Sequence, residues 1–511
     1  MKVVECYIEV EESKIDLYGA GKMKILLIEP PFERFIGQRC EWYPIGLTSI
    51  ATLLHEHGYA TKVYNAEHDN SLRYINTEVY LNSYNKYKEC LSDEGNYIWQ
   101  EIIHDITEFD PDIVGISVKS VKIPTTIKIA EICKRINKNI IVVTGGFHAT
   151  NKPEDLLKSE HIDIVVRGEG EETFLQLVNS ISSGSHGFDN INGISFKGTD
   201  GAIINTQDRE LMGALDNIPF PMRELIWGYE KYMPEQLGWI MTSRGCPYDC
   251  SYCNSKTIWN RRVRFVSLDR IFEEIRYLKK AFNATHITFM DDSFTVNRKR
   301  VLEFCQMLIE QKIGITWSCL TRADLVDEEI VRKMKDAGCV KFDIGIESGS
   351  ERIQKLINKG IDFSDVRRAS GIFKKCGMFW TGFFMMGFPT ETKDDILKTL
   401  SFMKEVRPNW AYLSIFTPYP GSKFYDMAKN DAMISDDEDG SSFSHQSPNN
   451  CFSKDISNEE FRAITKVMFK EFNSYNNSLA SLLRRAQSRK YHKNPKNFIR
   501  DARKVLSWLK N

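Results

Sequence analysis

The stretch Thr242-Ser-Arg-Gly-Cys246-Pro-Tyr-Asp-Cys250-Ser-Tyr-Cys253 places three cysteines at C-x3-C-x2-C spacing. It follows an apolar run at residues 237–241 that is typical of a strand, and Gly245 and Pro247 interrupt regular structure. We therefore expect the thiols on a loop where they turn toward one point. Three thiolates suit a soft metal, and cysteine thiolates hold iron–sulfur clusters. A zinc site is the alternative, but zinc usually takes four ligands, and no second C-x2-C or H-x3-H follows nearby.

Strands and helices alternate on the carboxyl side of this loop. The pattern predicts helices at 267–282 and 297–311 and strands near 286–290, 315–319, 340–347, 379–386 and 410–416. With the strand before the cysteines, this gives a partial (β/α)6 TIM-type barrel over residues 237–430. The chemistry of such barrels sits at the carboxyl ends of the strands. The polar or glycine-bearing residues expected at those ends are Asp291, Asp292, Arg322, Glu347, Ser348, Gly387 and Pro389.

A second α/β pattern precedes the barrel, over residues 23–180. Apolar runs near 24–28, 61–64, 112–117, 139–144 and 162–166 alternate with helical segments, and residues 67–107 form an insertion. Such a pattern predicts a doubly wound, Rossmann-like parallel sheet, which binds ligands outside the carboxyl ends of its strands. The loops expected there contain Pro30, Ser117, Gly145, Gly146, His148, Gly168 and Glu169.

The remaining segments connect or extend these two domains. Residues 1–22 form an N-terminal extension, and residues 181–236 read as a linker with a hairpin near 198–201. The C-terminal region, 431–511, begins with an acidic, turn-rich stretch at 433–458, either a lid or a surface loop. It ends in helices with a basic patch, for which a solvated helix face is the simplest interpretation.

The composition restricts the class of protein. A chain of 511 residues with 42% hydrophobic residues can bury two or three cores, and a net charge of -1 gives no sign of nucleic-acid binding. The N-terminus has no signal-peptide pattern and no run of 18 apolar residues occurs, so we expect a cytoplasmic protein without a membrane span. Scattered cysteines fit a reducing compartment.

The C-x3-C-x-aromatic-C motif resembles the signature of radical S-adenosylmethionine (SAM) enzymes. Four loop motifs resemble the cobalamin-binding domain that precedes the radical domain in a large class of them: Pro30-Pro31, Tyr43-Pro-Ile-Gly-Leu47, Gly145-Gly-Phe-His-Ala-Thr150 and Gly168-Glu-Gly-Glu171. The resemblance covers about residues 24–430. It implies a cobalamin-binding Rossmann-like domain, a radical SAM partial barrel and a helical C-terminal region.

The resemblance also assigns roles to residues. Cys246, Cys250 and Cys253 would ligate a [4Fe-4S] cluster whose open iron chelates SAM, with Tyr252 beside the adenine. Asp291 or Asp292 would hold the SAM amino group, Glu347 and Ser348 the ribose or methionine part, and the Gly387–Pro389 loop the adenine. The Arg322 guanidinium is suited to pair with the SAM carboxylate through two parallel hydrogen bonds. Cobalamin would contact Pro30, Tyr43, Ser117, Gly145, Gly146, His148, Gly168 and Glu169.

One departure from the family pattern concerns the lower face of cobalt. Many cobalamin domains carry D-x-H-x-x-G, whose histidine ligates cobalt, and this sequence contains no such motif. We therefore expect cobalamin without a histidine beneath it. Arg34, Arg39 and Tyr43 in the loop 32–45 are candidates for that face.

The function that the resemblance implies is a cobalamin-dependent radical SAM enzyme, with methyl transfer to an unactivated carbon preferred. A 5′-deoxyadenosyl radical would remove hydrogen and methylcobalamin would deliver the methyl group. Ring formation or rearrangement with the same cofactors is the alternative, and a non-catalytic corrinoid or metal sensor ranks last. A methylthiotransferase is disfavoured because the N-terminal domain has no second cysteine triad. The expected partners are a small-molecule, lipid or peptide substrate and an electron donor such as a ferredoxin or flavodoxin.

Overall fold

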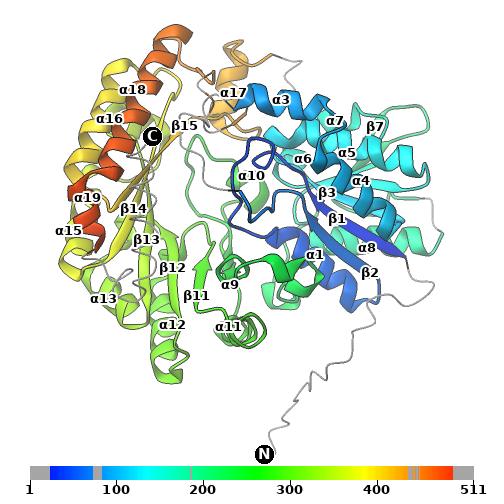
Figure 1. Cartoon of the computed structure of the whole chain (residues 1–511), viewed down its shortest axis with the longest axis horizontal. Helices are drawn as coiled ribbons and strands as arrows, with labels where there is room; N and C mark the ends of the chain where they lie inside the picture. The colour runs from blue at the N-terminus through cyan, green and yellow to red at the C-terminus, as the bar shows by residue number, and fades with distance from the viewer. Residues whose placement is uncertain are drawn as a thin grey trace, which may run out of the picture.

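The computed structural model describes residues 23–72, 83–184, 187–435, 440, 443–444, 447 and 449–486. Two α/β units lie side by side, with the helical C-terminal segments along the outer side of the second (Figure 1). The N-terminal extension and most of the C-terminal basic patch fall outside the described residues.

The first unit is a seven-stranded sheet in the order β2-β1-β3-β4-β5-β6-β7. Its strands are β1 (Lys24–Glu29), β2 (Ala60–Asn65), β3 (Ile113–Ser117), β4 (Ile141–Gly145), β5 (Ile164–Val166), β6 (Ile194–Lys197) and β7 (Ile203–Asn205). β1 to β5 are parallel, and the antiparallel β6–β7 hairpin extends the sheet beyond β5. The predicted hairpin is therefore present and belongs to this sheet. The order reverses between β1 and β3, which is the switch point of a doubly wound fold.

Helices cover both faces of this sheet, which explains its continuous apolar strands. On β1, Leu26 and Ile28 pack in one core with α4 (Tyr97–Phe109) and α5 (Ile123–Ile136). Ile25 and Leu27 pack on the other face with α1 (Ile45–Glu56) and α8 (Gly170–Ser182). The insertion contains α4 and α3 (Tyr84–Ser92), while the short helices α6 (Phe147–Asn151) and α7 (Pro153–Leu157) follow β4.

The second unit is a six-stranded parallel sheet in the order β15-β14-β13-β12-β11-β8. Its strands are β8 (Trp239–Ile240), β11 (His286–Phe289), β12 (Thr316–Thr321), β13 (Cys339–Glu347), β14 (Phe379–Met386) and β15 (Trp410–Ile415). The helices between them are α11 (Leu268–Phe282), α12 (Arg298–Gln311), α13 (Glu328–Asp336), α14 (Glu351–Ile357), α15 (Phe363–Cys376) and α16 (Lys393–Val406). Among the described strands, β8 and β15 are the two edges of this sheet and do not pair with each other, so the barrel is open. This confirms the predicted partial (β/α)6 barrel.

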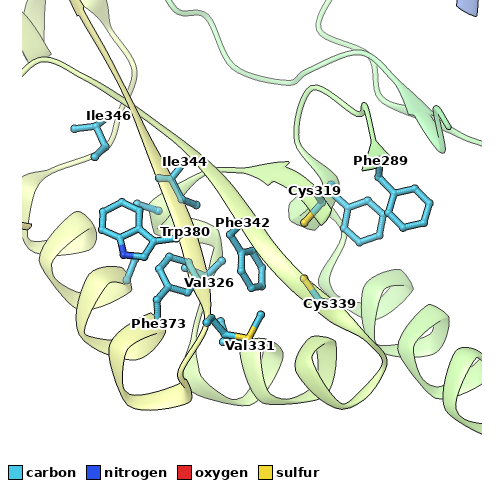
Figure 2. Packing of buried hydrophobic residues seen from close by; sticks show 14 of the residues in the cluster. Phe289, Cys319, Val326, Val331, Cys339, Phe342, Ile344, Ile346, Phe373 and Trp380 are labelled. Carbon is cyan, nitrogen blue, oxygen red and sulfur yellow. The ribbon is translucent and has the colours of Figure 1, made fainter. Parts of the chain in front are cut away.

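The barrel core fixes which side chains face inward. Phe342, Ile344 and Ile346 of β13 point toward the helix side, where they pack with Phe373 and Trp380 (Figure 2). Because side chains alternate along a strand, Lys341, Asp343, Gly345 and Glu347 occupy the inner face.

Helix α17 (Lys423–Asn430) ends the barrel domain, and the C-terminal region packs against the barrel with α18 (Asn458–Asn477) and α19 (Leu479–Ala486). Within the partly described stretch 433–458, Phe443 and Phe452 are buried with Phe388 and Phe416. This stretch therefore contributes to a hydrophobic core, although its polar composition predicted a lid or a surface loop. In the described part of the chain, no helix combines the length and apolar character needed to cross a bilayer.

Candidate active site

The cysteine loop follows the short strand β9 (Ser243–Arg244), which pairs with β10 (Arg264–Phe265). Gly245 has φ 99°, and a Cβ there would lie 1.9 Å from the carbonyl oxygen of Arg262, so only glycine fits. Inside the loop, Ser251 donates from its amide to the Ile357 carbonyl at 2.8 Å and accepts from the Phe424 amide at 3.1 Å. The loop is thus held from three parts of the barrel.

The three sulfurs of Cys246, Cys250 and Cys253 fit a cluster better than a single ion. Within the described residues, these sulfurs do not all lie within 4.8 Å of one another. Tetrahedral zinc with bonds of about 2.3 Å holds its sulfurs under about 4 Å apart. Burial raises the pKa of all three thiols, that of Cys253 to about 12. A bound metal would supply the positive charge that removes these protons.

Asp291 and Asp292 follow β11 and differ in their surroundings. Asp291 is buried and accepts hydrogen bonds from the amides of Thr242 at 2.6 Å and Ser243 at 3.2 Å. It therefore fixes the start of the cysteine segment. Asp292 is exposed, and its charge raises the pKa of Cys246 and Cys253. Asp292 is thus the carboxylate open to a ligand beside the sulfurs.

At the end of β13, the buried Glu347 and Lys359 form a polar group with the half-buried Tyr252. The Tyr252 hydroxyl donates to Glu347 Oε1 at 3.1 Å, and the Lys359 ammonium pairs with the same oxygen. Glu347 has φ 70° at a register shift between β13 and β14, an uncommon conformation for a non-glycine residue. The fold therefore turns this carboxylate toward the aromatic residue of the cysteine motif.

Arg322 and Ser348 already have partners within the protein. The Arg322 guanidinium forms a fork with Asp324, with both contacts at 3.0 Å, and lies 3.5 Å from the ring centre of Tyr248. Ser348 is buried, and its hydroxyl lies 3.2 Å from Thr399 Oγ1. In this structure, Arg322 supports the cysteine loop and Ser348 supports the turn after β13.

The loop after β14 depends on Glu391, which lies two residues after Pro389. Its Oε2 accepts from the amides of Gly387 and Phe388, the latter at 3.1 Å. Its Oε1 is buried without a hydrogen-bond partner, and burial raises the pKa of this carboxyl to about 8. Glu391 therefore shapes the loop that contains Gly387 and Pro389.

The inner face of the barrel carries further side chains that the sequence did not reveal. Phe383 and Tyr412 stack with ring centres 5.4 Å apart, and Tyr412 is 49% exposed. Deeper along β13, Lys341 Nζ lies 2.9 Å from Asp343 Oδ2, while Asp343 Oδ1 is buried without a hydrogen-bond partner. The alternation of polar and apolar residues along β13 could have identified Lys341 and Asp343 from the sequence, whereas the contact of Tyr412 with Phe383 required the pairing of β14 with β15.

The carboxyl edge of the first sheet leaves space beside its backbone, but the histidine there already has partners within the protein. Ser117, Gly145 and Gly146 lie together at the ends of β3 and β4, and the space beside Gly168 is open. His148 is 4% exposed, with Nδ1 3.0 Å from the Ser120 hydroxyl and Nε2 3.5 Å from Asp155 Oδ2. Small residues at a carboxyl edge suit close approach of a large flat ligand such as cobalamin, while His148 faces the protein.

Three residues proposed for the lower cobalt face make other contacts. Arg34 pairs with Glu101 at 2.7 Å, and Arg39 pairs with Glu41 at 3.0 Å. Tyr43 is buried and donates to the Trp239 carbonyl at 3.0 Å, so it joins the two domains. Pro30 is buried at the end of β1.

A buried ion cluster near the end of β1 was missed by the sequence analysis. Lys122 Nζ lies 2.6 Å from Glu29 and 2.8 Å from Glu67, and all three side chains are at most 4% exposed. Glu29 ends β1, Glu67 follows β2 and Lys122 follows β3. Because these residues are far apart in the sequence, no local pattern indicated that they form a cluster. It occupies the switch point between β1 and β3 and fixes the loops there.

Glu169 lies between the two domains. It accepts from Arg244 at 2.8 Å and from Arg264 at 2.7 Å, and the adjacent Glu171 also pairs with Arg244. Two further contacts join the carboxyl edges of the sheets, because a Cβ at Gly421 would meet Asn151 and one at Gly440 would meet Ser120. The carboxyl edges of the two sheets therefore face one another.

Comparison with known proteins agrees with both units. The model of the radical SAM superfamily matches residues 240–403, and that of the B12 binding domain matches residues 39–178. An uncharacterized methyltransferase of Pyrococcus horikoshii is 34% identical over 80% of this chain and 83% of its own length. An anaerobic magnesium-protoporphyrin IX monomethyl ester cyclase of Rubrivivax gelatinosus is 29% identical over 64% of this chain and 60% of its own.

Solved structures share the two-unit fold. The radical SAM methyltransferase TsrM of Kitasatospora setae, with cobalamin and a [4Fe-4S] cluster bound, aligns with a TM-score of 0.61 at 16% identity, over 81% of this chain and 76% of its own. The cobalamin-dependent radical enzyme OxsB aligns with a TM-score of 0.64 at 16% identity, over 96% of this chain and 71% of its own.

Proposed function

Because this chain belongs to the radical SAM enzymes that carry an N-terminal B12-binding domain, we propose that it transfers a methyl group from cobalamin to an unactivated carbon. The observation that carries this proposal is the opposition of the two carboxyl edges through Glu169, Gly421 and Gly440. A corrinoid on one edge would face SAM and substrate on the other. The cofactors are a [4Fe-4S] cluster, SAM and cobalamin.

When bound, these cofactors supply hydrogen abstraction by a carbon radical and a transferable methyl group. The residues of the chain then bind and orient. Asp292 would hold the SAM ammonium through a charge-assisted hydrogen bond, Glu347 would contact the ribose, and Tyr252 would lie beside the adenine. Gly387 and Pro389 would border the adenine. We give Asp291, Arg322 and Ser348 positioning roles, because each is bonded to the segments around the site.

We further propose that the substrate is a small molecule bound on the inner face of the barrel. The Phe383–Tyr412 stack offers a flat apolar surface, and Asp343 offers an acceptor without a partner. A substrate with a conjugated or apolar part and a hydrogen-bond donor complements this face. All eleven cysteines in the described residues are free thiols, which supports a cytoplasmic location.

Ring formation is the second candidate, supported by the similarity to the Rubrivivax cyclase. Anaerobic reaction of the reconstituted enzyme with cell extract and methyl-labelled SAM separates the two. Methyl transfer gives a labelled product together with 5′-deoxyadenosine, whereas ring formation gives 5′-deoxyadenosine and no labelled product. Tyr412→Ala should lose product while keeping SAM cleavage. Loss of SAM cleavage in that variant would contradict the assigned substrate face.

A further inference from the structure

The outer side of the cysteine loop carries a cluster of cations around one carboxylate. Asp249, between the first two cysteines, pairs with Arg261 at 2.6 Å and with Lys423 at 2.7 Å. Lys256 also lowers the pKa of Asp249, and Arg262 is exposed next to Arg261. We call Lys256, Arg261, Arg262 and Lys423 the cationic patch.

The fold brings this patch together from two separate segments. Lys256 lies on α10 (Ser255–Trp259), directly after the third cysteine, while Lys423 begins α17. The two segments touch, because a Cβ at Gly421 would lie 2.8 Å from Thr257. Arg261 and Lys423 are 49% and 48% exposed, so each contacts Asp249 and still presents charge to solvent.

The patch is a local excess of positive charge. The whole chain has a net charge of -1, so three cations that act on Asp249, with Arg262 next to them in the sequence, do not reflect a basic protein. The side of the loop near Arg244 is covered by the first domain through Glu169 and Glu171. The patch therefore forms part of the solvent-exposed surface of the cysteine loop.

We propose that the cationic patch docks an acidic one-electron carrier protein, of the flavodoxin or ferredoxin type, that reduces the cluster. The inference rests on the proposed function, because reductive cleavage of SAM consumes an electron. In the docked complex, one electron leaves the reduced carrier and enters the cluster, and no covalent bond forms or breaks. Complementary charge accelerates association by about tenfold to a thousandfold and makes it sensitive to salt.

The test compares protein and chemical reductants on the reconstituted full-length enzyme. Lys256→Glu/Arg262→Glu reverses two charges and leaves the Asp249 ion pairs in place. With reduced flavodoxin, this variant should reduce its cluster at least tenfold more slowly at low salt, and added salt should slow the wild type more than the variant. With dithionite, both proteins should be reduced at the same rate. Lys333→Glu/Lys374→Glu, on α13 and α15 away from the loop, is the charge-matched control.

The outcomes separate the docking inference from the proposed function. Equal flavodoxin rates in the wild type and the Lys256→Glu/Arg262→Glu variant would overturn the docking site. An equal slowing in Lys333→Glu/Lys374→Glu would also overturn it, since the effect would then follow from net charge. Failure of the wild type to bind iron or to cleave SAM with dithionite would contradict the proposed function itself.

Discussion

Arg244, two residues before the first cysteine, donates to Glu169 at 2.8 Å across the boundary between the two domains. The Glu169 side chain is 2% exposed and also accepts from Arg264, so one buried carboxylate pairs with two arginines. Because Arg244 lies in β9, this contact connects the β5–α8 turn of the first domain to the cysteine loop. Ion pairs therefore hold the β5–α8 turn against the strand that leads into the cysteine loop.

Glu169→Gln should destabilise the enzyme strongly. The change removes the charge that compensates buried arginines, and breaking a buried pair costs about 3–5 kcal/mol. Thermal unfolding at neutral pH measures the loss. Glu172→Gln is the matched control, because exposed Glu172 pairs with Arg209 only at 3.6 Å and should change stability by less than about 1 kcal/mol. Equal effects of the two changes would contradict the role of Glu169.

Gly245→Ala should prevent assembly of the cysteine loop. The new Cβ would overlap the Arg262 carbonyl, and φ 99° disfavours any side chain. We expect iron content after anaerobic reconstitution to fall to the level of a Cys250→Ala variant. Gly371→Ala in α15 has free space and should retain iron, with stability raised by up to about 1 kcal/mol.

The sequence predicted the elements because their signals are local. Continuous apolar runs identified strands buried on both faces, such as β1, and the cysteine spacing identified the loop on which the site is built. Carboxylates were predicted at the right strand ends, but their roles depended on contacts from distant segments. Glu169 meets Arg244 from 75 residues away, and no local pattern encodes that contact.

The polar stretch 433–458 shows a second limit of predicting structure from the sequence. Its composition suggested a lid or surface loop, yet the isolated Phe443 and Phe452 are buried. Two aromatic side chains at wide spacing give no periodicity, although they are enough to fix a loop on a core. The contact of Tyr412 with Phe383 on the inner face of the barrel was missed for a related reason, because it depends on the register between β14 and β15.

Alanine substitutions of Asp291 and Asp292 should have different effects on iron content and SAM affinity. Asp291→Ala leaves the amides of Thr242 and Ser243 without an acceptor, which costs about 1–3 kcal/mol and should lower iron content. Asp292→Ala should retain the cluster and weaken SAM binding at least tenfold, because a charge-assisted hydrogen bond to the ammonium is lost. Iron analysis and equilibrium dialysis with SAM measure the two effects. Unchanged SAM affinity in Asp292→Ala would remove this residue from the binding site.

Glu391 should make the free energy of unfolding depend on pH at values above the usual pKa range of carboxyl groups. Burial raises its pKa in the folded protein to about 8, from 4.5 in the unfolded chain. Because the folded state favours the protonated form, its contribution is complete below about pH 4.5 and is lost as the pH rises to about 8. Glu391→Gln imitates the neutral form, so its stability relative to wild type should increase across this window by about 2–4 kcal/mol. Denaturant unfolding at pH 5 and pH 8 measures it, and parallel profiles would refute the assignment.

His148 should not ligate cobalt. The cobalamin-domain motif with a ligating histidine is missing, and His148 is held by Ser120 and Asp155 on the protein side with 4% exposure. With no histidine below, the corrinoid should bind in the base-off, histidine-off form, which eases reduction of cobalt. Electron paramagnetic resonance of the cobalt(II) state decides this, because a nitrogen ligand splits each cobalt line into three. We expect unsplit lines in wild type and in His148→Ala. Splitting present in wild type and lost only in His148→Ala would make this histidine the ligand, and splitting that persists in the variant would place the base of the cofactor itself on cobalt.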